Sequence, residues 1–73
     1  MKIQLTSCDA ARPDKRAIAK MLEEYADGMS PGDAREQTEF LLEGSPIDIE
    51  VSGNEGSAYR AFRKLDIDYE IQE

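Results

Sequence analysis

The sequence contains no histidine and a single cysteine among its 73 residues. Histidine has the side-chain pKa nearest neutral pH, so a general base here would have to be a carboxylate or lysine with a strongly shifted pKa. The single cysteine, Cys8, excludes an internal disulfide, and the lack of histidine excludes a cysteine and histidine set for zinc. We therefore expect no catalysis, no cofactor and no metal, with Cys8 as a small core residue and a redox role as its alternative.

Long apolar runs are also missing. Lys2 is followed by mixed sequence, unlike a signal peptide, and no segment is apolar over the length that a bilayer requires. We therefore expect a cytoplasmic protein with no membrane contact. A chain of 73 residues has room for one small domain, and an apolar content of 40% favours a folded chain over a disordered one. The predicted domain spans residues 1–73.

Positive charge is scarce, because nine Lys and Arg stand against sixteen Asp and Glu, for a net charge of −7. A general nucleic-acid binder normally carries a basic face, so we expect no direct binding of nucleic acid. The charges are unevenly distributed. Residues 1–20 hold five basic and two acidic side chains, whereas residues 21–59 hold Arg35 alone against ten acids. The chain is therefore basic early and acidic in the middle.

Alternating apolar and polar residues predict three strands with one buried face each, over residues 2–8, 47–51 and 67–71. Apolar residues spaced by three and four predict three amphipathic helices between these strands. The expected fold class is α+β, with the element order β-α-α-β-α-β. Its two layers are a three-stranded sheet and three helices packed on one face of that sheet.

Proline, glycine and serine mark the expected ends of the first two helices. Pro13 suits the first turn of the first helix, and Gly28 is expected to close that helix. The second helix should begin at Ser30 as its cap and stop near Gly44.

The start of the third helix has two candidate caps. Ser52 and Glu55 have the spacing of a capping box, and Asn54 is a competing cap. Gly53 and Gly56 belong to the same turn, which could present backbone amides to a phosphate but lacks the lysine of a P-loop. We therefore expect a turn into a helix.

The outer face of the predicted sheet is acidic. Asp48 and Glu50 alternate with apolar residues in the second strand, as do Asp68 and Glu70 in the third. Two carboxylates on one face are also the pattern of an acid and base pair or of a divalent metal site. Because burial of the opposite face produces the same alternation, we expect a solvated acidic face.

Four basic residues gather at the first helix, namely Arg12, Lys15, Arg16 and Lys20. They stand alone in an acidic chain, which makes this helix a candidate contact surface. The alternative is a solvated face whose charges pair with neighbouring acids such as Glu23, each pair contributing a few tenths of a kcal/mol.

Several short strings resemble the C-terminal domain of the bacterial ribosomal stalk protein, a module that recruits translational GTPases. "KRAIAK" (Lys15 to Lys20) is similar to the first-helix string of that family, and "FLLEGSP" (Phe40 to Pro46) to the end of its second helix. "VSGNE" (Val51 to Glu55) is similar to the entry into its third helix, and "IDYEI" (Ile67 to Ile71) to its closing strand. The Clp protease adaptor shares this general fold.

The resemblance implies a free-standing, non-catalytic domain that binds another protein through its first two helices. Contacts are implied at Lys15, Arg16, Ala19 and Lys20 and at the opening of the second helix. The implied partner is a translational GTPase or another macromolecular machine. The family's dimerisation domain and hinge have no counterpart in this sequence.

Five residues depart from the family's pattern. Arg16 and Ala19 stand where the family has larger aliphatic residues, Glu23 where it has a basic residue, and Glu36 and Glu39 where its second helix has lysines. The carboxylates of Glu23, Glu36 and Glu39 reduce the attraction toward an acidic partner, and charge of this kind governs encounter rate and partner choice.

A second hypothesis uses the opposite surface. Asp48, Glu50, Asp68 and Glu70 could imitate a nucleic-acid backbone and occupy a basic groove on a DNA-binding or RNA-binding protein. The two hypotheses place the contact on opposite sides of the domain and on charges of opposite sign.

Overall fold

The structure, a computed structural model, describes residues 1–72 and contains three strands and three helices. In chain order these are β1 (Lys2–Cys8), α1 (Lys15–Tyr25), α2 (Pro31–Leu42), β2 (Ile47–Glu50), α3 (Glu55–Lys64) and β3 (Ile67–Ile71). The predicted α+β class and element order are confirmed. Within the described residues, no helix combines the length and the apolar character needed to cross a membrane.

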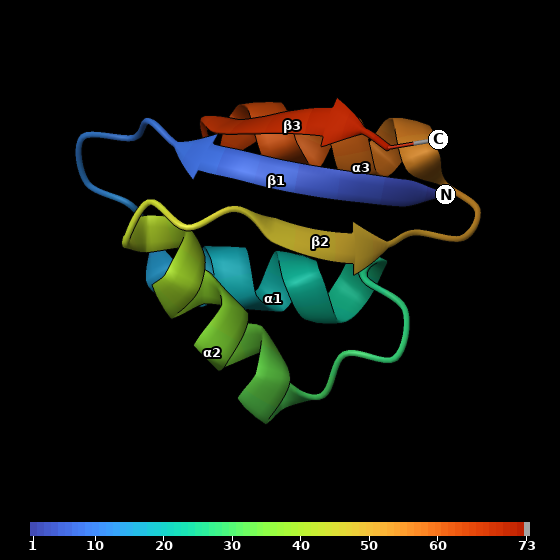
Figure 1. Cartoon of the computed structure of the whole chain (residues 1–73), viewed down its shortest axis with the longest axis horizontal. Helices are drawn as coiled ribbons and strands as arrows, with labels where there is room; N and C mark the ends of the chain where they lie inside the picture. The colour runs from blue at the N-terminus through green and yellow to red at the C-terminus, as the bar shows by residue number, and fades with distance from the viewer. Residues whose placement is uncertain (73) are drawn as a thin grey trace.

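β1 is the central strand of the sheet, which has the order β2-β1-β3 and antiparallel neighbours throughout (Figure 1). Ile3 pairs with Ile49 and Leu5 with Ile47, and all four side chains are buried on the side of the sheet that carries the helices. The alternation predicted from the sequence is therefore confirmed. The opposite face of the sheet is polar and largely exposed.

The ladder between β1 and β3 contains a bulge. Leu5 pairs with Tyr69, whereas Cys8, three residues further on, pairs with Ile67, two residues back along β3. The extra residue in β1 therefore keeps Cys8 on the helix side of the sheet, where it packs at the margin of the core. Its thiol lies 3.5 Å from the carbonyl oxygen of Leu65.

The three helices cover one face of the sheet, with α3 behind β1 and β3 in the view of Figure 1 and α1 and α2 on the β2 side. Phe62 of α3 is completely buried, and its ring centroid lies 6.4 Å from that of Tyr59 and 5.1 Å from that of Tyr69. Burial of such a ring stabilises the fold by roughly 2–3 kcal/mol. Helices α1 and α2 contribute the buried residues Ile18, Met21, Leu22, Ala34, Thr38 and Leu41.

The start of α1 differs from the prediction, which placed Pro13 inside its first turn. The helix begins at Lys15, and Asp14 is its N-cap, with a carboxylate oxygen that accepts the backbone N–H of Ala17 at 3.1 Å. The carboxylate satisfies an N–H that the first turn leaves free, so the aspartate that follows the proline occupies the cap position.

Two further helix ends also differ from the prediction. Helix α1 already ends at Tyr25, and Gly28 lies in the following turn with φ 70°, a conformation that favours glycine. The prediction of a capping box at Ser52 is wrong, because the competing candidate, Asn54, occupies the cap position of α3. The hydroxyl of Ser52 instead donates to the carboxylate of Asp27, so a contact with a distant loop replaces the local one.

Replacing Asp14 with alanine is expected to lower the free energy of unfolding by about 1 kcal/mol, because the N–H of Ala17 loses its acceptor. The replacement Asp14→Asn keeps an acceptor oxygen at the cap and should cost clearly less. Urea unfolding of the three proteins, followed by circular dichroism, measures both differences. Equal stability of wild type and Asp14→Ala would contradict the assignment of the cap.

Candidate functional site

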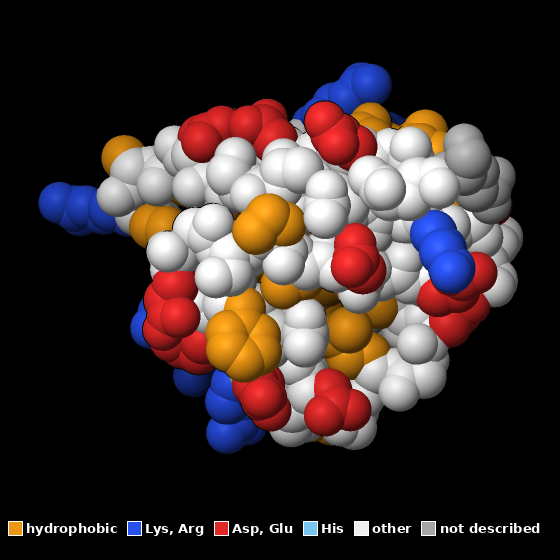
Figure 2. Space-filling view, in the orientation of Figure 1, with side chains coloured by type: hydrophobic (Ala, Val, Ile, Leu, Met, Phe, Trp, Pro, Cys, Tyr) orange, Lys and Arg blue, Asp and Glu red, His pale blue; other side chains and the backbone are white. Residues whose placement is uncertain are grey.

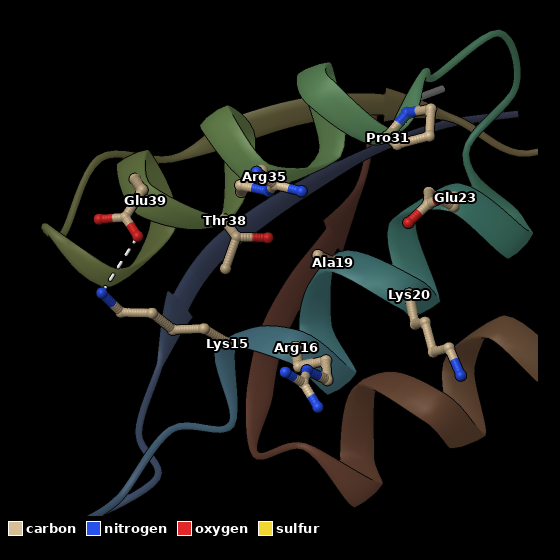
Figure 3. Close-up of a pocket in the computed structure, with 9 residues that line it drawn as sticks. All are labelled: Lys15, Arg16, Ala19, Lys20, Glu23, Pro31, Arg35, Thr38 and Glu39. Carbon is tan, nitrogen blue, oxygen red and sulfur yellow. Dashed lines mark ion pairs between the residues drawn. The ribbon is translucent and has the colours of Figure 1, made fainter.

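A groove of about 480 Å³ lies between α1 and α2 (Figure 3). Its lining is predominantly basic, with four cationic side chains, two carboxylates and three uncharged residues. The lining residues are Lys15, Arg16, Ala19, Lys20 and Glu23 from α1, and Pro31, Arg35, Thr38 and Glu39 from α2.

Helical spacing explains why these side chains meet. Lys15, Ala19 and Glu23 recur every four residues along α1 and therefore share one side of that helix. In α2, Pro31, Arg35 and Glu39 have the same spacing. The two rows face one another because α1 and α2 pack together on the sheet.

The uncharged part of the groove includes a small side chain, Ala19, and a hydroxyl that already has a hydrogen-bond partner, that of Thr38. Thr38 is only 2% exposed, and its hydroxyl donates to the carbonyl oxygen of Ala34 at 2.7 Å. Ala19 is half-buried, and its methyl group leaves open the volume that a larger aliphatic side chain would fill. Ala19 therefore leaves the groove open at this position.

One ion pair crosses the groove, between Lys15 Nζ and Glu39 Oε1 at 3.1 Å. The two side chains are 63% and 51% exposed, so the pair contributes less than about 1 kcal/mol. Arg16, Lys20 and Arg35 make no ion pair within residues 1–72, and the head groups of Arg16 and Lys20 lie at the α1 rim, turned away from α2 (Figure 3). Within residues 1–72, the positive charge that no carboxylate pairs with therefore lies at Arg35 and at the α1 rim, and the four cations and two carboxylates of the lining give it a net charge of +2.

Most of the predicted contact residues come together in this groove. Lys15, Arg16, Ala19 and Lys20 line it from α1. On α2, Glu39 lines the groove, whereas Glu36 is exposed outside the lining, as is Arg12, which precedes α1. The alternative was a solvated face whose cations pair with acids of the same helix. The ion pair that the cluster forms within residues 1–72 instead joins Lys15 of α1 to Glu39 of α2.

Arg35 is a groove residue that the sequence analysis did not select. Its signal was present in the charge distribution, because it is the only basic residue between positions 21 and 59. The contribution of α2 to the surface was therefore predicted as acidic, from Glu36 and Glu39, although α2 also contributes a cation.

The predicted acidic residues lie on the outer face of the sheet, where Asp48, Glu50, Asp68 and Glu70 are exposed on the two strands that flank β1. Figure 2 shows acidic side chains over β2 and over β3 on this face. Within residues 1–72, no group of three or more carboxylate, thiol or imidazole side chains is placed to hold a metal ion. Asp9 lies beside Asp68, and a hydrogen bond and charge repulsion between the two carboxyl groups raise the pKa of Asp9.

Comparison with protein-family models, with curated proteins and with solved structures gives no match. The chemistry of the groove is therefore the guide to function. Exposed cations around an uncharged floor can bind a segment that carries carboxylates, through both charge and shape.

The replacement Asp9→Asn is expected to raise the melting temperature near neutral pH. A carboxyl group whose pKa is raised in the folded state stabilises the fold below its unfolded pKa, and this contribution is lost as pH rises through the folded pKa. The variant should therefore exceed wild type at pH 7, and the difference should vanish near about pH 3.

Thermal unfolding of both proteins across this pH range tests the expectation. Asp48→Asn removes one charge from the same face and serves as the control, with a smaller and less pH-dependent effect. A difference between Asp9→Asn and wild type that stays constant with pH would contradict repulsion by Asp68 as its cause.

Proposed function

We propose that this chain is a non-catalytic protein-binding domain whose groove between α1 and α2 receives an acidic segment of a partner protein. The observation that supports this proposal is the gathering of Lys15, Arg16, Lys20 and Arg35 around one groove in a chain of net charge −7. A cytoplasmic location, as expected from the sequence, is part of the proposal.

The charge distribution favours an oriented encounter. An acidic segment is repelled by the acidic face of the sheet and attracted by the cations of the groove, which favours an approach from the α1 and α2 side. Exposed charge pairs add little affinity by themselves, because water and salt screen them. The uncharged lining formed by Ala19, Pro31 and Thr38 supplies the remaining contact area, so the segment should carry an apolar side chain beside its carboxylates.

The likeness to the ribosomal stalk domain supports this location of the surface. The resemblance implies contacts at Lys15, Arg16, Ala19 and Lys20, and these four residues line the groove. It also implies a translational GTPase as partner. Glu23 and Glu39 weaken the attraction of the groove for any acidic surface, so the attraction to such a partner is smaller here than for the family's basic helices.

A second candidate function rests on the acidic outer face. Asp48, Glu50, Asp68 and Glu70 are exposed, and within residues 1–72 the helices pack on the other face. In this alternative the face imitates a nucleic-acid backbone and enters a basic groove of a DNA-binding or RNA-binding protein.

Binding of a defined peptide tests the groove. The probe is a short acidic peptide with one central phenylalanine, compared with a peptide in which Gln and Asn replace its acids. Ala19→Leu fills the groove without changing charge and should weaken binding of the acidic peptide about tenfold. The double variant with Lys15→Glu and Lys20→Glu should weaken it at least as much, because attraction becomes repulsion.

The matched control is the double variant with Arg60→Glu and Lys64→Glu on α3, which changes the net charge equally outside the groove. It should retain most of the affinity, and amide shifts on binding should be confined to α1 and α2. Losses that depend on net charge alone, or loss of binding on neutralising Asp48, Glu50, Asp68 and Glu70, would contradict a groove site.

Removing the internal carboxylate is expected to strengthen binding. Glu39 forms an ion pair with Lys15 in the free protein, so a carboxylate of the peptide must displace Glu39 to reach Lys15. Glu39→Gln should therefore raise the affinity for the acidic peptide about threefold. Glu36→Gln makes the same charge change on the same helix outside the groove, and titration calorimetry should show a smaller gain for it. Equal gains would indicate long-range charge in place of displacement.

A further inference from the structure

The two edges of the sheet differ in how they are covered. At the β2 edge, the backbone N–H of Asp27 donates to the carbonyl oxygen of Glu50 at 2.7 Å, and the hydroxyl of Ser52 donates to the carboxylate of Asp27. The turn after α1 therefore covers the Glu50 end of this edge. At the β3 edge, the part of the chain that the structure describes places no further strand, and α3 lies behind β3 (Figure 1).

The direction of the backbone groups in β3 follows from the ladder. The N–H of Gln72 donates to the carbonyl oxygen of Lys2 at 2.9 Å, so the backbone groups of Gln72 point toward β1. Because these directions alternate along a strand, those of Glu70 also point toward β1, whereas those of Tyr69 and Ile71 point away from the sheet. Within residues 1–72, no backbone hydrogen bond reaches this outer side of Tyr69 or Ile71.

The side chains beside this edge have two different characters. Ile71 is 51% exposed, the larger exposed fraction of the two exposed large hydrophobic residues within residues 1–72, and it lies on the helix side of the sheet with Tyr69. The ring of Tyr69 is stacked on that of Tyr59 with centroids 5.1 Å apart, which holds the strand end in place. Asp68 and Glu70 are exposed on the other face.

We propose that the outer edge of β3 accepts an extended segment of a basic partner protein as a fourth strand. The segment would alternate apolar residues with lysine or arginine. Its backbone would bond to the outward groups of Tyr69 and Ile71, its apolar side chains would contact Ile71, and its cations would lie beside Asp68 and Glu70. This site is separate from the α1 and α2 groove and takes a segment of opposite charge.

Charge opposes a second copy of this chain as the occupant. Antiparallel pairing of two β3 strands about Tyr69 would place Asp68 of each copy opposite Glu70 of the other. Like charges directly opposite one another destabilise a strand pair, and each copy carries a net charge of −7. The same carboxylates that oppose self-pairing attract a basic strand.

Amide hydrogen exchange tests the proposal with a defined probe, a short capped peptide of alternating lysine and valine. A saturating amount of this peptide should slow the exchange of the Tyr69 and Ile71 amides. The amide of Gln72, already bonded to Lys2, serves as the internal reference. The double variant with Asp68→Lys and Glu70→Lys should bind the peptide about tenfold more weakly and should instead bind its glutamate and valine counterpart.

Two further variants separate the edge from the acidic face as a whole. The double variant with Asp48→Lys and Glu50→Lys makes the same charge change at the β2 edge and should keep the affinity within about twofold. Ile71→Pro removes an outward N–H without touching the bonds to β1 and should abolish the protection of Tyr69.

Three results would overturn the proposal. The first is unchanged exchange of Tyr69 and Ile71 at saturating peptide. The second is an equal loss of affinity from charge reversal at either edge, which would indicate a diffuse attraction to the whole face. The third is a wild-type protein that sediments as a dimer with both amides protected before any peptide is added, which would indicate self-pairing. Groove binding of acidic peptides is unaffected by any of these results.

Discussion

The structure depends on the burial of one face of a small sheet. The chain is long enough to place helices on one side of β1, β2 and β3, and within residues 1–72 the other side has no second layer. Ile3, Leu5, Ile47 and Ile49 therefore fill one side of the central ladder, and the residues between them must tolerate water. The polar outer face, the packing of α1 against α2 and the difference between the two sheet edges follow from this one-sided core.

Much of this arrangement could be predicted from periodicity. The strands alternate between apolar and polar residues except at Thr6 and Ser7, and the helices repeat at three and four, so both the element order and the buried sides are evident from the sequence. The helix ends were predicted less well, because they depend on competing partners. Asp14 caps α1 later in the chain than Pro13 suggested, and Ser52 bonds to Asp27, a residue whose proximity only the fold reveals.

The α1 side of the candidate site was predicted, and the α2 side was predicted only in part. The resemblance to the stalk domain implied contacts at Lys15, Arg16, Ala19 and Lys20, and because all four lie on one helix, helical spacing places them along one groove. Arg35 and the ion pair between Lys15 and Glu39 depend on how α2 packs across α1, and no local pattern encodes that distance. The open edge of β3 likewise requires the strand order, since β3 would be closed if it lay at the centre of the sheet.

The exposed ion pair between Lys15 and Glu39 limits what charge alone can contribute to groove binding. When a partner's carboxylate replaces Glu39, one exposed ion pair is exchanged for another, and the net free energy of that exchange is close to zero. The cations at the rim, Arg16 and Lys20, speed the encounter but are hydrated before and after it. In the proposed function, affinity therefore comes from apolar contact with Ala19 and Pro31, because Thr38 is only 2% exposed and offers little surface. A partner that carried carboxylates without an apolar side chain would meet the groove quickly and leave it quickly.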